Sequence, residues 1–389
     1  MDIRATTALV DGALVGPVRL RVEAGQISAV TVGPAAAAGP APEVDLVGVT
    51  LTPGLLDLQI NGCFGVDFAD ASPDQWAAVL ARLASRGVTG IEPTIITAPL
   101  DHLPAAFARV DQADARHRDE SVCRILGAHL EGPFISPARG GMHRTDWMID
   151  PTPEALDELL GSEVTRRILR TVTLAPEREH ALEAIRRFVA AGFIVSVGHS
   201  DATADQVAAA ADAGATMTTH VFNAQRPLTH RDPGVPGGVL ADDRFFIGTI
   251  IDGLHIDPRV VGIVAAAAPG RMVGVTDAIV TAGLPPHTPF HFGGHTIAND
   301  DTGLGRREDN TIAGAGILLD EGVRRMIAAG MDPAVVLASC TEVAAHSLGR
   351  TDVGQLSVGA RADLVAWGSD WNPVRIWVGG AEVEVGEPV

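Results

Sequence analysis

The sequence contains no lysine and no tyrosine, so its 29 basic residues are all arginines. Lysine forms the Schiff base of pyridoxal enzymes, binds phosphate in P-loop nucleotidases and, when carbamylated, bridges two metal ions in some hydrolases. None of these lysine-dependent sites can exist in this chain. Cysteine is scarce too: Cys63, Cys123 and Cys340 are odd in number and far apart, which predicts reduced thiols in a cytoplasmic enzyme rather than a disulfide framework.

Further absences concern membranes and nucleic acids. No apolar run reaches the roughly 18 residues of a membrane-spanning helix, so we expect no such span. The first residues, Met1-Asp2-Ile3-Arg4, lack the basic-then-apolar pattern of a secretion signal. The net charge of −19 repels nucleic acid and anionic membrane surfaces. We expect neither as a partner, whereas a small anionic substrate held by local cations remains compatible with this charge.

Short strand-like segments separated by turn residues occupy both ends of the chain, at 1–52 and 354–389. Neither end alone has enough apolar residues to build a core. We therefore expect the two ends to combine into one small β-sandwich domain, which would bring the termini together.

Strand-like and helix-like segments alternate between these ends, over 53–353. Strands are expected at 55–60, 90–96, 125–130, 172–175, 194–198, 216–221, 246–251 and 272–276. Helices are expected at 73–85, 103–116, 179–191, 204–213, 258–268, 315–329 and 333–348. This alternation predicts an α/β protein with a catalytic (β/α)8 TIM-like barrel. The alternative is a doubly wound open sheet, which would need a G-x-G-x-x-G turn after the first strand, and the sequence has none there.

Polar residues stand where the chain leaves the predicted strands. Catalytic side chains of a (β/α)8 barrel gather at the carboxyl ends of its strands. A single histidine at such a position is more often structural, but six polar strand ends on one rim indicate a shared site. They are Asp57 to Gly62, His129 to Glu131, His199, His220, Asp252 to His255, and Asp277.

Glu131, His199 and His220 form a set of two histidines and one carboxylate. Three protein ligands leave one position open for water, as in catalytic zinc sites. A divalent metal lowers the pKa of its bound water and polarises a carbonyl group. Asp277 lies two predicted strands further round the rim, where a carboxylate could accept the proton of that water and pass it to a leaving amine. Asp277 could instead be a fourth metal ligand or the N-cap of the next helix.

Ordered motifs along nearly the whole chain resemble those of the N-acetylglucosamine-6-phosphate deacetylases of the amidohydrolase superfamily. The principal matching stretches are Leu51-Thr52-Pro53-Gly54, Gln59-Ile60-Asn61-Gly62-Cys63, Glu92-Pro93-Thr94-Ile95-Ile96-Thr97, His129-Leu130-Glu131-Gly132-Pro133-Phe134, Gly198-His199-Ser200, His220-Val221-Phe222-Asn223-Ala224, Ile251-Asp252-Gly253-Leu254-His255 and Val275-Thr276-Asp277-Ala278. The resemblance implies hydrolysis of N-acetyl-D-glucosamine 6-phosphate to glucosamine 6-phosphate and acetate, in amino-sugar catabolism or cell-wall recycling.

The resemblance also implies roles for individual residues. Glu131, His199 and His220 would hold the metal, Asp277 would be the general base and acid, and His143 would contact the acetyl carbonyl. Arg231 would reach the phosphate in the active site of a partner subunit, so a homodimer is implied. Further substrate contacts are implied for Met142, Asn223, Ala224, Asp252, Gly253, Leu254, His255, Ile312, Ala313 and Gly314.

The chain departs from many amidohydrolases at the end of the first barrel strand, where Gln59 and Asn61 replace an H-x-H pair. Neutral amides are poor zinc ligands. We therefore expect one divalent metal per subunit, zinc first, with iron, cobalt, manganese or cadmium as alternatives. Cys63 keeps a second metal open at Gln59, Asn61 and Cys63. Two other functions also stay open: another amidohydrolase, such as an N-acyl-amino-acid deacylase or a cyclic amide hydrolase, or a non-catalytic homologue.

Overall fold

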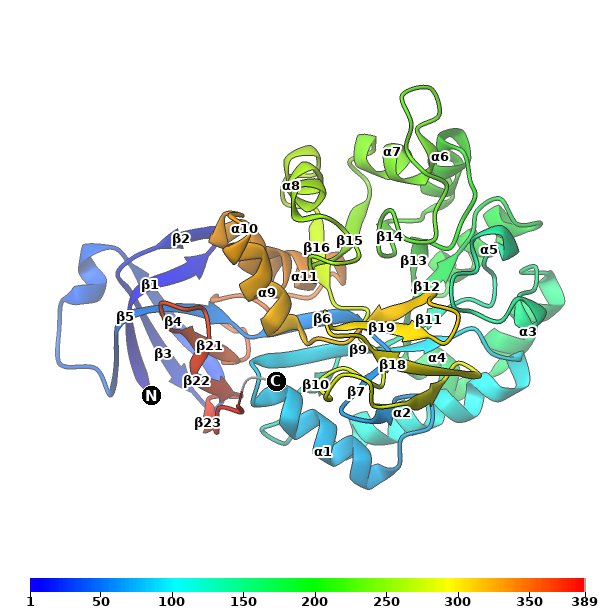
Figure 1. Cartoon of the computed structure of the whole chain (residues 1–389). Helices are drawn as coiled ribbons and strands as arrows, with labels where there is room; N and C mark the ends of the chain where they lie inside the picture. The colour runs from blue at the N-terminus through cyan, green and yellow to red at the C-terminus, as the bar shows by residue number, and fades with distance from the viewer. Residues whose placement is uncertain (388–389) are drawn as a thin grey trace.

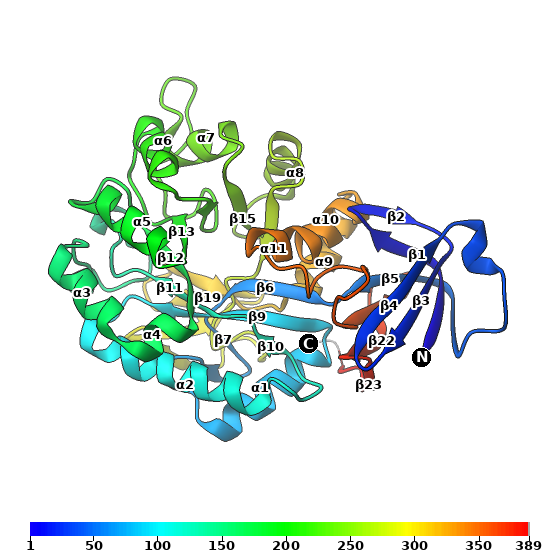
Figure 2. The same ribbon diagram turned by 180° about the vertical axis from the view of Figure 1, so that it is seen from behind.

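The computed structural model describes residues 1–387, and it has two parts that lie side by side (Figure 1). One part is a barrel surrounded by helices. The other is a smaller β-structure in which strands from the beginning and the end of the chain lie together, drawn in blue and red. The same arrangement is seen from behind in Figure 2.

The small β-structure is one eight-stranded sheet with the order β23-β22-β21-β5-β1-β3-β4, and β2 pairs with β1. Its strands are β1 (Asp2–Val10), β2 (Ala13–Val15), β3 (Val18–Glu23), β4 (Gln26–Val32), β5 (Val44–Pro53), β21 (Leu364–Trp367), β22 (Pro373–Val378) and β23 (Ala381–Val383). A bridge between Gln26 and Arg361 brings β4 back towards β21. The curled sheet encloses its own core, which includes Leu20, Leu364 and Trp377. Apolar side chains from both ends are therefore buried against one another.

The barrel confirms the predicted (β/α)8 fold. Its strands pair in parallel and are β6 (Leu55–Ile60), β9 (Val88–Ile96), β11 (Ala128–Glu131), β12 (Leu169–Leu174), β13 (Ile194–Val197), β14 (Met217–Thr218), β15 (Phe246–Ile250) and β16 (Met272–Val275). A parallel bridge from Ile60 to Ala278 brings the last strand against the first. The six residues of β6 are all buried, as expected for a strand covered on both faces.

Helices follow each of the first seven barrel strands, and three more lie near the end of the chain. Ser72 and Thr203 cap α1 and α6 with reciprocal bonds to Gln75 and Gln206. The helices are α1 (Pro73–Ala84), α2 (Leu103–His117), α3 (Pro153–Gly161), α4 (Glu163–Ile168), α5 (Ala181–Ala190), α6 (Ala204–Ala213), α7 (Gly234–Ala241), α8 (Pro258–Ala267), α9 (Leu319–Ala328), α10 (Pro333–Ser339) and α11 (Glu342–Ser347). None of the helices in residues 1–387 has the length and apolar character needed to cross a bilayer.

Several predicted bounds were wrong. The strand expected at 125–130 is divided into β10 (Arg124–Ile125) and β11, because Gly127 between them has a φ of +143°. The strand expected at 216–221 shortens to β14, because the chain turns away before His220. The helix expected at 333–348 splits into α10 and α11.

An antiparallel sheet of four strands was not expected at all. It consists of β17 (Phe290–Phe292), β18 (His295–Asn299), β19 (Leu304–Arg307) and β20 (Ile312–Ala315). It is inserted between β16 and α9, so the helix expected at 315–329 begins only at Leu319. A small two-stranded sheet, β7 (Gly62–Cys63) with β8 (Val66–Asp67), follows β6.

Glu92 of β9 is a carboxyl group buried inside the barrel. Thr171 donates a 2.9 Å hydrogen bond to its Oε2. Burial raises the pKa of Glu92 to about 7, against the opposing effects of the Thr171 hydroxyl and the charges of Arg170 and Arg350. Its carboxyl therefore holds a proton more tightly in the folded chain than in the unfolded one, where the pKa of a glutamate is about 4.3.

The difference between the pKa of Glu92 in the folded and in the unfolded chain predicts that the protein loses stability as the pH rises. The folded state binds more protons than the unfolded state between the two pKa values, so stability falls as the pH rises through this window. Between roughly pH 5.5 and pH 8, the free energy of unfolding of the wild type should fall by about 2 kcal/mol more than that of Glu92→Gln. Urea unfolding at both pH values measures it, with exposed Glu154→Gln as the control. Equal pH dependence in wild type and Glu92→Gln would contradict the prediction.

Candidate active site

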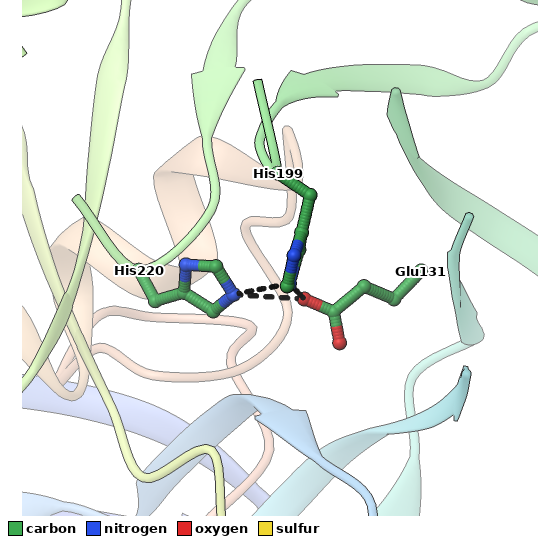
Figure 3. Close-up of side chains that lie close together, drawn as sticks. All are labelled: Glu131, His199 and His220. Atoms are coloured by element: carbon green, nitrogen blue, oxygen red, sulfur yellow. Dashed lines mark hydrogen bonds and ion pairs between the residues drawn. The ribbon is translucent and has the colours of Figure 1, made fainter. Parts of the chain in front are cut away.

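Three potential metal ligands converge at the carboxyl ends of β11, β13 and β14 (Figure 3). Glu131 is the last residue of β11, and His199 and His220 follow β13 and β14 by two residues each. The Nε2 atom of His220 lies 2.9 Å from Glu131 Oε1, and that of His199 lies 3.3 Å from the same oxygen. All three side chains are buried.

The hydrogen bonding of this group suits a cation. His199 Nδ1 lies 2.8 Å from the carbonyl oxygen of Arg139, so it must donate a proton there, and Nε2 is the ring nitrogen directed at the group, where its lone pair could bind a metal. The two Nε2 atoms lie only 3.0 Å apart. Burial opposes the charge of Glu131, but the neighbouring His199 and His220 rings hold its pKa well below the usual value. One anionic oxygen and two imidazole nitrogens thus form a donor set that a divalent metal fits.

The backbone at these ligands adopts uncommon conformations. His199, His220 and Asp277 have φ values of +46°, +32° and +53°. Left-handed conformations are costly for residues other than glycine, and they persist where the surrounding structure imposes them. Here each one turns a side chain into the mouth of the barrel directly after its strand ends.

Asp277 lies next to the metal group and is held by the two amide side chains of the first barrel strand. Asn61 Nδ2 donates to Asp277 Oδ1 over 2.8 Å. Gln59 Nε2 lies 3.2 Å from Glu131 Oε1 and 3.3 Å from Asp277 Oδ1. Burial, together with the negative charge of Glu131, raises the pKa of Asp277 to about 6. A carboxyl group with this pKa can accept and release a proton near neutral pH.

The hydrogen bonds of Gln59 and Asn61 also affect whether these two residues can bind a second metal. Gln59 and Asn61 direct amide protons at carboxylates, and an amide proton cannot bind a cation. Cys63 is buried, and burial raises the pKa of its thiol above the usual value. Among residues 1–387, the cluster of potential ligands comprises Glu131, His199 and His220, without Cys63. A second metal at Gln59, Asn61 and Cys63 stays an alternative prediction.

His143 stands against the metal group, with its Nε2 atom 4.0 Å from Glu131 Oε2. Its Nδ1 atom lies 2.8 Å from the hydroxyl of Thr97, which also donates to the carbonyl oxygen of Glu131 over 3.2 Å. With the Thr97 proton used in this way, Nδ1 of His143 is the donor and Nε2 is an acceptor. Burial and the neighbouring His199 lower the pKa of His143 to about 3, so the ring is neutral. Gly132, with φ +85°, leaves room for Thr97, whose hydroxyl lies 2.1 Å from where a Cβ atom would stand.

A cavity of about 290 Å³ opens on these side chains. Most of the predicted site residues line it, which brings the metal group, Asp277 and His143 together with segments far apart in the sequence. The lining residues named in the sequence analysis are Asn61, Glu131, Met142, His143, His199, His220, Asn223, Ala224, His255, Asp277, Ile312, Ala313 and Gly314.

Six of the predicted residues, Cys63 among them, lie outside this lining. Asp252 is behind His255: its Oδ2 lies 2.6 Å from His255 Nδ1, which leaves Nε2 of the ring for the cavity. The backbone N–H groups of Leu254 and His255 donate to the other carboxylate oxygen. Burial opposes this charge, but the His255 ring holds the pKa of Asp252 below its usual value. Gln59 and the flanking Gly253 and Leu254 are also absent from the lining.

Arg231 is the sixth, and it is exposed in the loop that precedes α7. Residues 227–231 are all exposed, so this loop presents its side chains to solvent. The structure does not bring Arg231 into the cavity of its own chain.

Sequence reasoning missed four residues at the site. Ile96, Gly141 and Thr311 line the cavity, and Thr97 supports His143. Thr97 directly follows β9, so the rule that polar residues gather at strand ends could have found it. Ile96 stands in the family-like stretch from Glu92 to Thr97, from which no role was assigned to it, and Gly141 and Thr311 were not assigned a role either.

Comparison with known proteins agrees with this geometry. The profile described as the amidohydrolase family matches residues 50–383, which include the whole barrel and β21 to β23. The chain belongs to the amidohydrolase family.

Several relatives of the chain are named as deacetylases of phosphorylated N-acetyl amino sugars. The chain is 36% identical to an N-acetylglucosamine-6-phosphate deacetylase of Vibrio furnissii, over 87% of this chain and 84% of the relative. It is 34% identical to an N-acetylgalactosamine-6-phosphate deacetylase of Escherichia coli O157:H7, over 85% and 86%. A similar solved structure is a mutant N-acetyl-D-glucosamine-6-phosphate deacetylase of Mycobacterium smegmatis in complex with N-acetyl-D-glucosamine-6-phosphate. Its TM-score is 0.91 and its identity 31%, with 99% of each chain covered.

Proposed function

We propose that this amidohydrolase removes the acetyl group of N-acetyl-D-glucosamine 6-phosphate by hydrolysis and releases glucosamine 6-phosphate and acetate. The proposal rests chiefly on one observation. A potential metal group, the carboxyl of Asp277 and the ring of His255 all face one cavity. The named relatives, which act on sugars of this class, support the choice of substrate.

We further propose one divalent metal per chain, zinc first, held by Glu131, His199 and His220. Such an ion supplies a water of lowered pKa and polarises a carbonyl group. The neutral amides of Gln59 and Asn61 favour a single ion, because they are poor zinc ligands and already donate to carboxylates.

Asp277 is the proton carrier in this proposal. Its carboxylate accepts a proton from the attacking water and delivers it to the nitrogen of the leaving amino sugar, as general base and then general acid. Asn61 holds the carboxylate in place through its 2.8 Å hydrogen bond. In the tautomer that carries its single ring proton on Nε2, with Thr97 donating to Nδ1, His143 donates to the acetyl oxygen.

The phosphate is placed at the side of the cavity formed by Asn223, Ala224 and His255, with Arg231 contributed by a partner subunit. Met142, Ile312, Ala313 and Gly314 contact the sugar, while Asp252, Gly253 and Leu254 position His255. We also propose a homodimer, the division into 1–52 with 354–389 and 53–353, and a cytoplasmic location. The three free, buried cysteines support that location.

One assay tests the function. Acetate release should be followed with N-acetylglucosamine 6-phosphate and with N-acetylgalactosamine 6-phosphate, because both substrates occur in the names of relatives. The enzyme is used as prepared, stripped of metal and restored with zinc, and metal is counted per chain. Release that depends on about one metal per chain supports the proposal. No release from the glucosamine derivative by metal-replete enzyme overturns it.

Arg231→Ala tests the phosphate contact. Loss of one bidentate arginine–phosphate contact should lower kcat/KM for the phosphorylated substrate by about 10- to 100-fold. Unphosphorylated N-acetylglucosamine should be affected far less. Arg259→Ala is a matched control because its side chain is 90% exposed and lies away from the cavity. Equal losses with both substrates would refute a phosphate role.

Mixing two variants of reduced activity tests whether Arg231 acts across a dimer. A mixed dimer of Arg231→Ala and Asp277→Asn contains one site with an intact Asp277 and an Arg231 from the other subunit. Activity should therefore rise on mixing if the arginine acts in the partner's site. An unchanged activity in exchanged dimers would place Arg231 in its own subunit.

A further inference from the structure

A second hollow, of about 540 Å³, lies away from the active site and is lined by six of the arginines. They are Arg118, Arg124, Arg166, Arg167, Arg170 and Arg350, and we call this hollow the arginine pocket. Asp114 is the single carboxylate among its lining residues. In a chain of net charge −19, so many cations around one hollow make it a local exception.

The arginine pocket lies at the amino ends of the barrel strands, opposite the metal group. Arg124 begins β10, Arg170 is the second residue of β12, and Phe193 of the lining directly precedes β13. His199 follows the same strand β13 at its other end. At the rise of a β-strand, the six residues from Phe193 to His199 span roughly 20 Å. An occupant of the arginine pocket would therefore not touch the substrate.

Three of the six arginines are paired with carboxylates. Arg118 bonds to Asp114 over 2.6 Å and Arg350 bonds to Asp352 over 2.6 Å. Arg167 bonds to Asp111 over 2.6 Å, and its side chain is 55% exposed. These pairs are partly solvated, so they fix the guanidinium groups without removing them from the surface of the hollow.

The other three arginines lack such a partner. Arg170 donates over 2.7 Å to the carbonyl oxygen of Leu348, and Arg166 donates to that of Leu160. Within residues 1–387, no carboxylate comes within 4.0 Å of either guanidinium. Arg124 comes no nearer than 3.7 Å to Asp352, a carboxylate already bonded to Arg350. The arginine pocket thus carries positive charge that the described part of the chain leaves uncompensated.

The pKa of Arg124 reflects the repulsion among the positive charges around the arginine pocket. Burial, together with the charges of Arg361 and Arg350, lowers the pKa of its guanidinium. Glu92 acts on Arg350 from the barrel interior, but burial raises the pKa of this carboxyl to about 7, so it is not a full counter-charge. A bound anion would relieve the repulsion among these cations.

We propose that the arginine pocket binds a compact, multiply charged anion bearing phosphate groups. The planar guanidinium group binds phosphate through two parallel hydrogen bonds. The apolar lining residues Ile125, Leu126, Ile168, Leu169 and Phe193 are each at most 8% exposed. Ala191 is an exposed apolar residue of the lining, but its side chain is a single methyl group. The hollow therefore offers little apolar surface to a nucleotide base or a lipid chain, and it selects compact hydrophilic ligands such as pyrophosphate or a phosphorylated sugar.

The negative charge of the whole chain does not exclude this ligand. Charges further away than the Debye length, about 8 Å at physiological salt, are largely screened. The arginines that line the hollow therefore act on its occupant more strongly than remote carboxylates do. Binding should consequently weaken as sodium chloride is added. The proposal is independent of the deacetylase function.

Calorimetric titration of the whole protein with inorganic pyrophosphate tests the proposal. Arg124→Gln is the first variant, because none of the hydrogen bonds described for the chain involves its guanidinium group, so the fold should not depend on it. Loss of one charge-assisted contact should weaken pyrophosphate binding by about 10-fold or more. Arg170→Gln is a second variant, and Arg259→Gln, far more exposed, is the matched control. Glucosamine 6-phosphate, inorganic phosphate and ADP as further titrants distinguish the kinds of phosphate ligand.

Pyrophosphate that binds in the active site would give the same calorimetric signal as pyrophosphate in the arginine pocket. His255→Gln is therefore titrated as well, to distinguish the two locations. Pyrophosphate binding that survives in His255→Gln, weakens in Arg124→Gln and Arg170→Gln, and is unchanged in Arg259→Gln supports the proposal. Binding that is lost in His255→Gln but unchanged in both pocket variants overturns it. Absence of any binding at millimolar pyrophosphate in low salt also overturns it. Tighter binding of ADP than of pyrophosphate would contradict the compact ligand class.

Discussion

Asp277→Asn should bind metal as the wild type does and lose about three orders of magnitude in turnover, because one group provides both the general base and the general acid. The amide is nearly the same size as the carboxyl, so the packing against Asn61 and Gln59 is kept. It has no proton to release to the leaving nitrogen and accepts none from water. Steady-state acetate release, with metal counted on the same samples, measures the effect.

A half-buried carboxyl outside the active site controls for the change of charge. Burial raises the pKa of Asp67 to about 6, as for Asp277, yet Asp67 does not line the active-site cavity. Asp67→Asn should therefore retain turnover close to that of the wild type. Near-normal turnover in Asp277→Asn, or loss of its metal, would contradict the role assigned to this carboxyl.

Glu131→Gln should lose both metal and activity, which is the second large effect. The substitution removes the one anionic ligand of the group and leaves two neutral imidazoles, to which a divalent ion binds far more weakly. Wild-type enzyme stripped with a chelator should behave in the same way and recover when zinc is added. Turnover should fall by at least about 1,000-fold in both cases, because the attacking water then has an ordinary pKa.

Stability provides a readout that does not depend on catalysis. A ligand present at about 1,000 times its dissociation constant stabilises the folded state by about 4 kcal/mol. Metal should therefore raise the free energy of unfolding of the wild type by roughly this amount and leave Glu131→Gln nearly unchanged. Glu154→Gln is an exposed control that should respond as the wild type does. Equal metal stabilisation of wild type and Glu131→Gln would exclude Glu131 as a ligand.

The active-site cavity also shows how much of the site can be predicted from the sequence. Glu131, His199 and His220 follow separate apolar segments, and the barrel rule alone brings such positions to one rim. The structure places their ligand atoms within 4.8 Å of one another. The bounds of β14 and the sheet β17 to β20 could not be derived in this way. Short segments containing glycine and charged residues have no periodicity that distinguishes a strand from a loop.

The hydrogen bonds around the metal group were beyond sequence reasoning for a different reason. Gln59 and Asn61 were predicted to be poor metal ligands from their chemistry alone. Their positions near the carboxyl of Asp277, more than 200 residues further along the chain, follow from closure of the barrel between β16 and β6. The direction of the proton between Thr97 and His143 likewise depends on a carbonyl of another strand.

The arginines show most clearly which properties the sequence determines and which properties only the folded structure decides. The sequence by itself determined that every basic side chain is a guanidinium group, that the chain is strongly acidic, and which histidines and carboxylates end the barrel strands. The tertiary structure alone decided that six arginines from the residue after α2, from β10, α4 and β12, and from the segment after α11 surround one hollow. Composition and strand periodicity are properties of the chain and can be read along it. Charge pairing and hydrogen-bond direction depend on distances between segments remote in sequence, and only folding sets those distances.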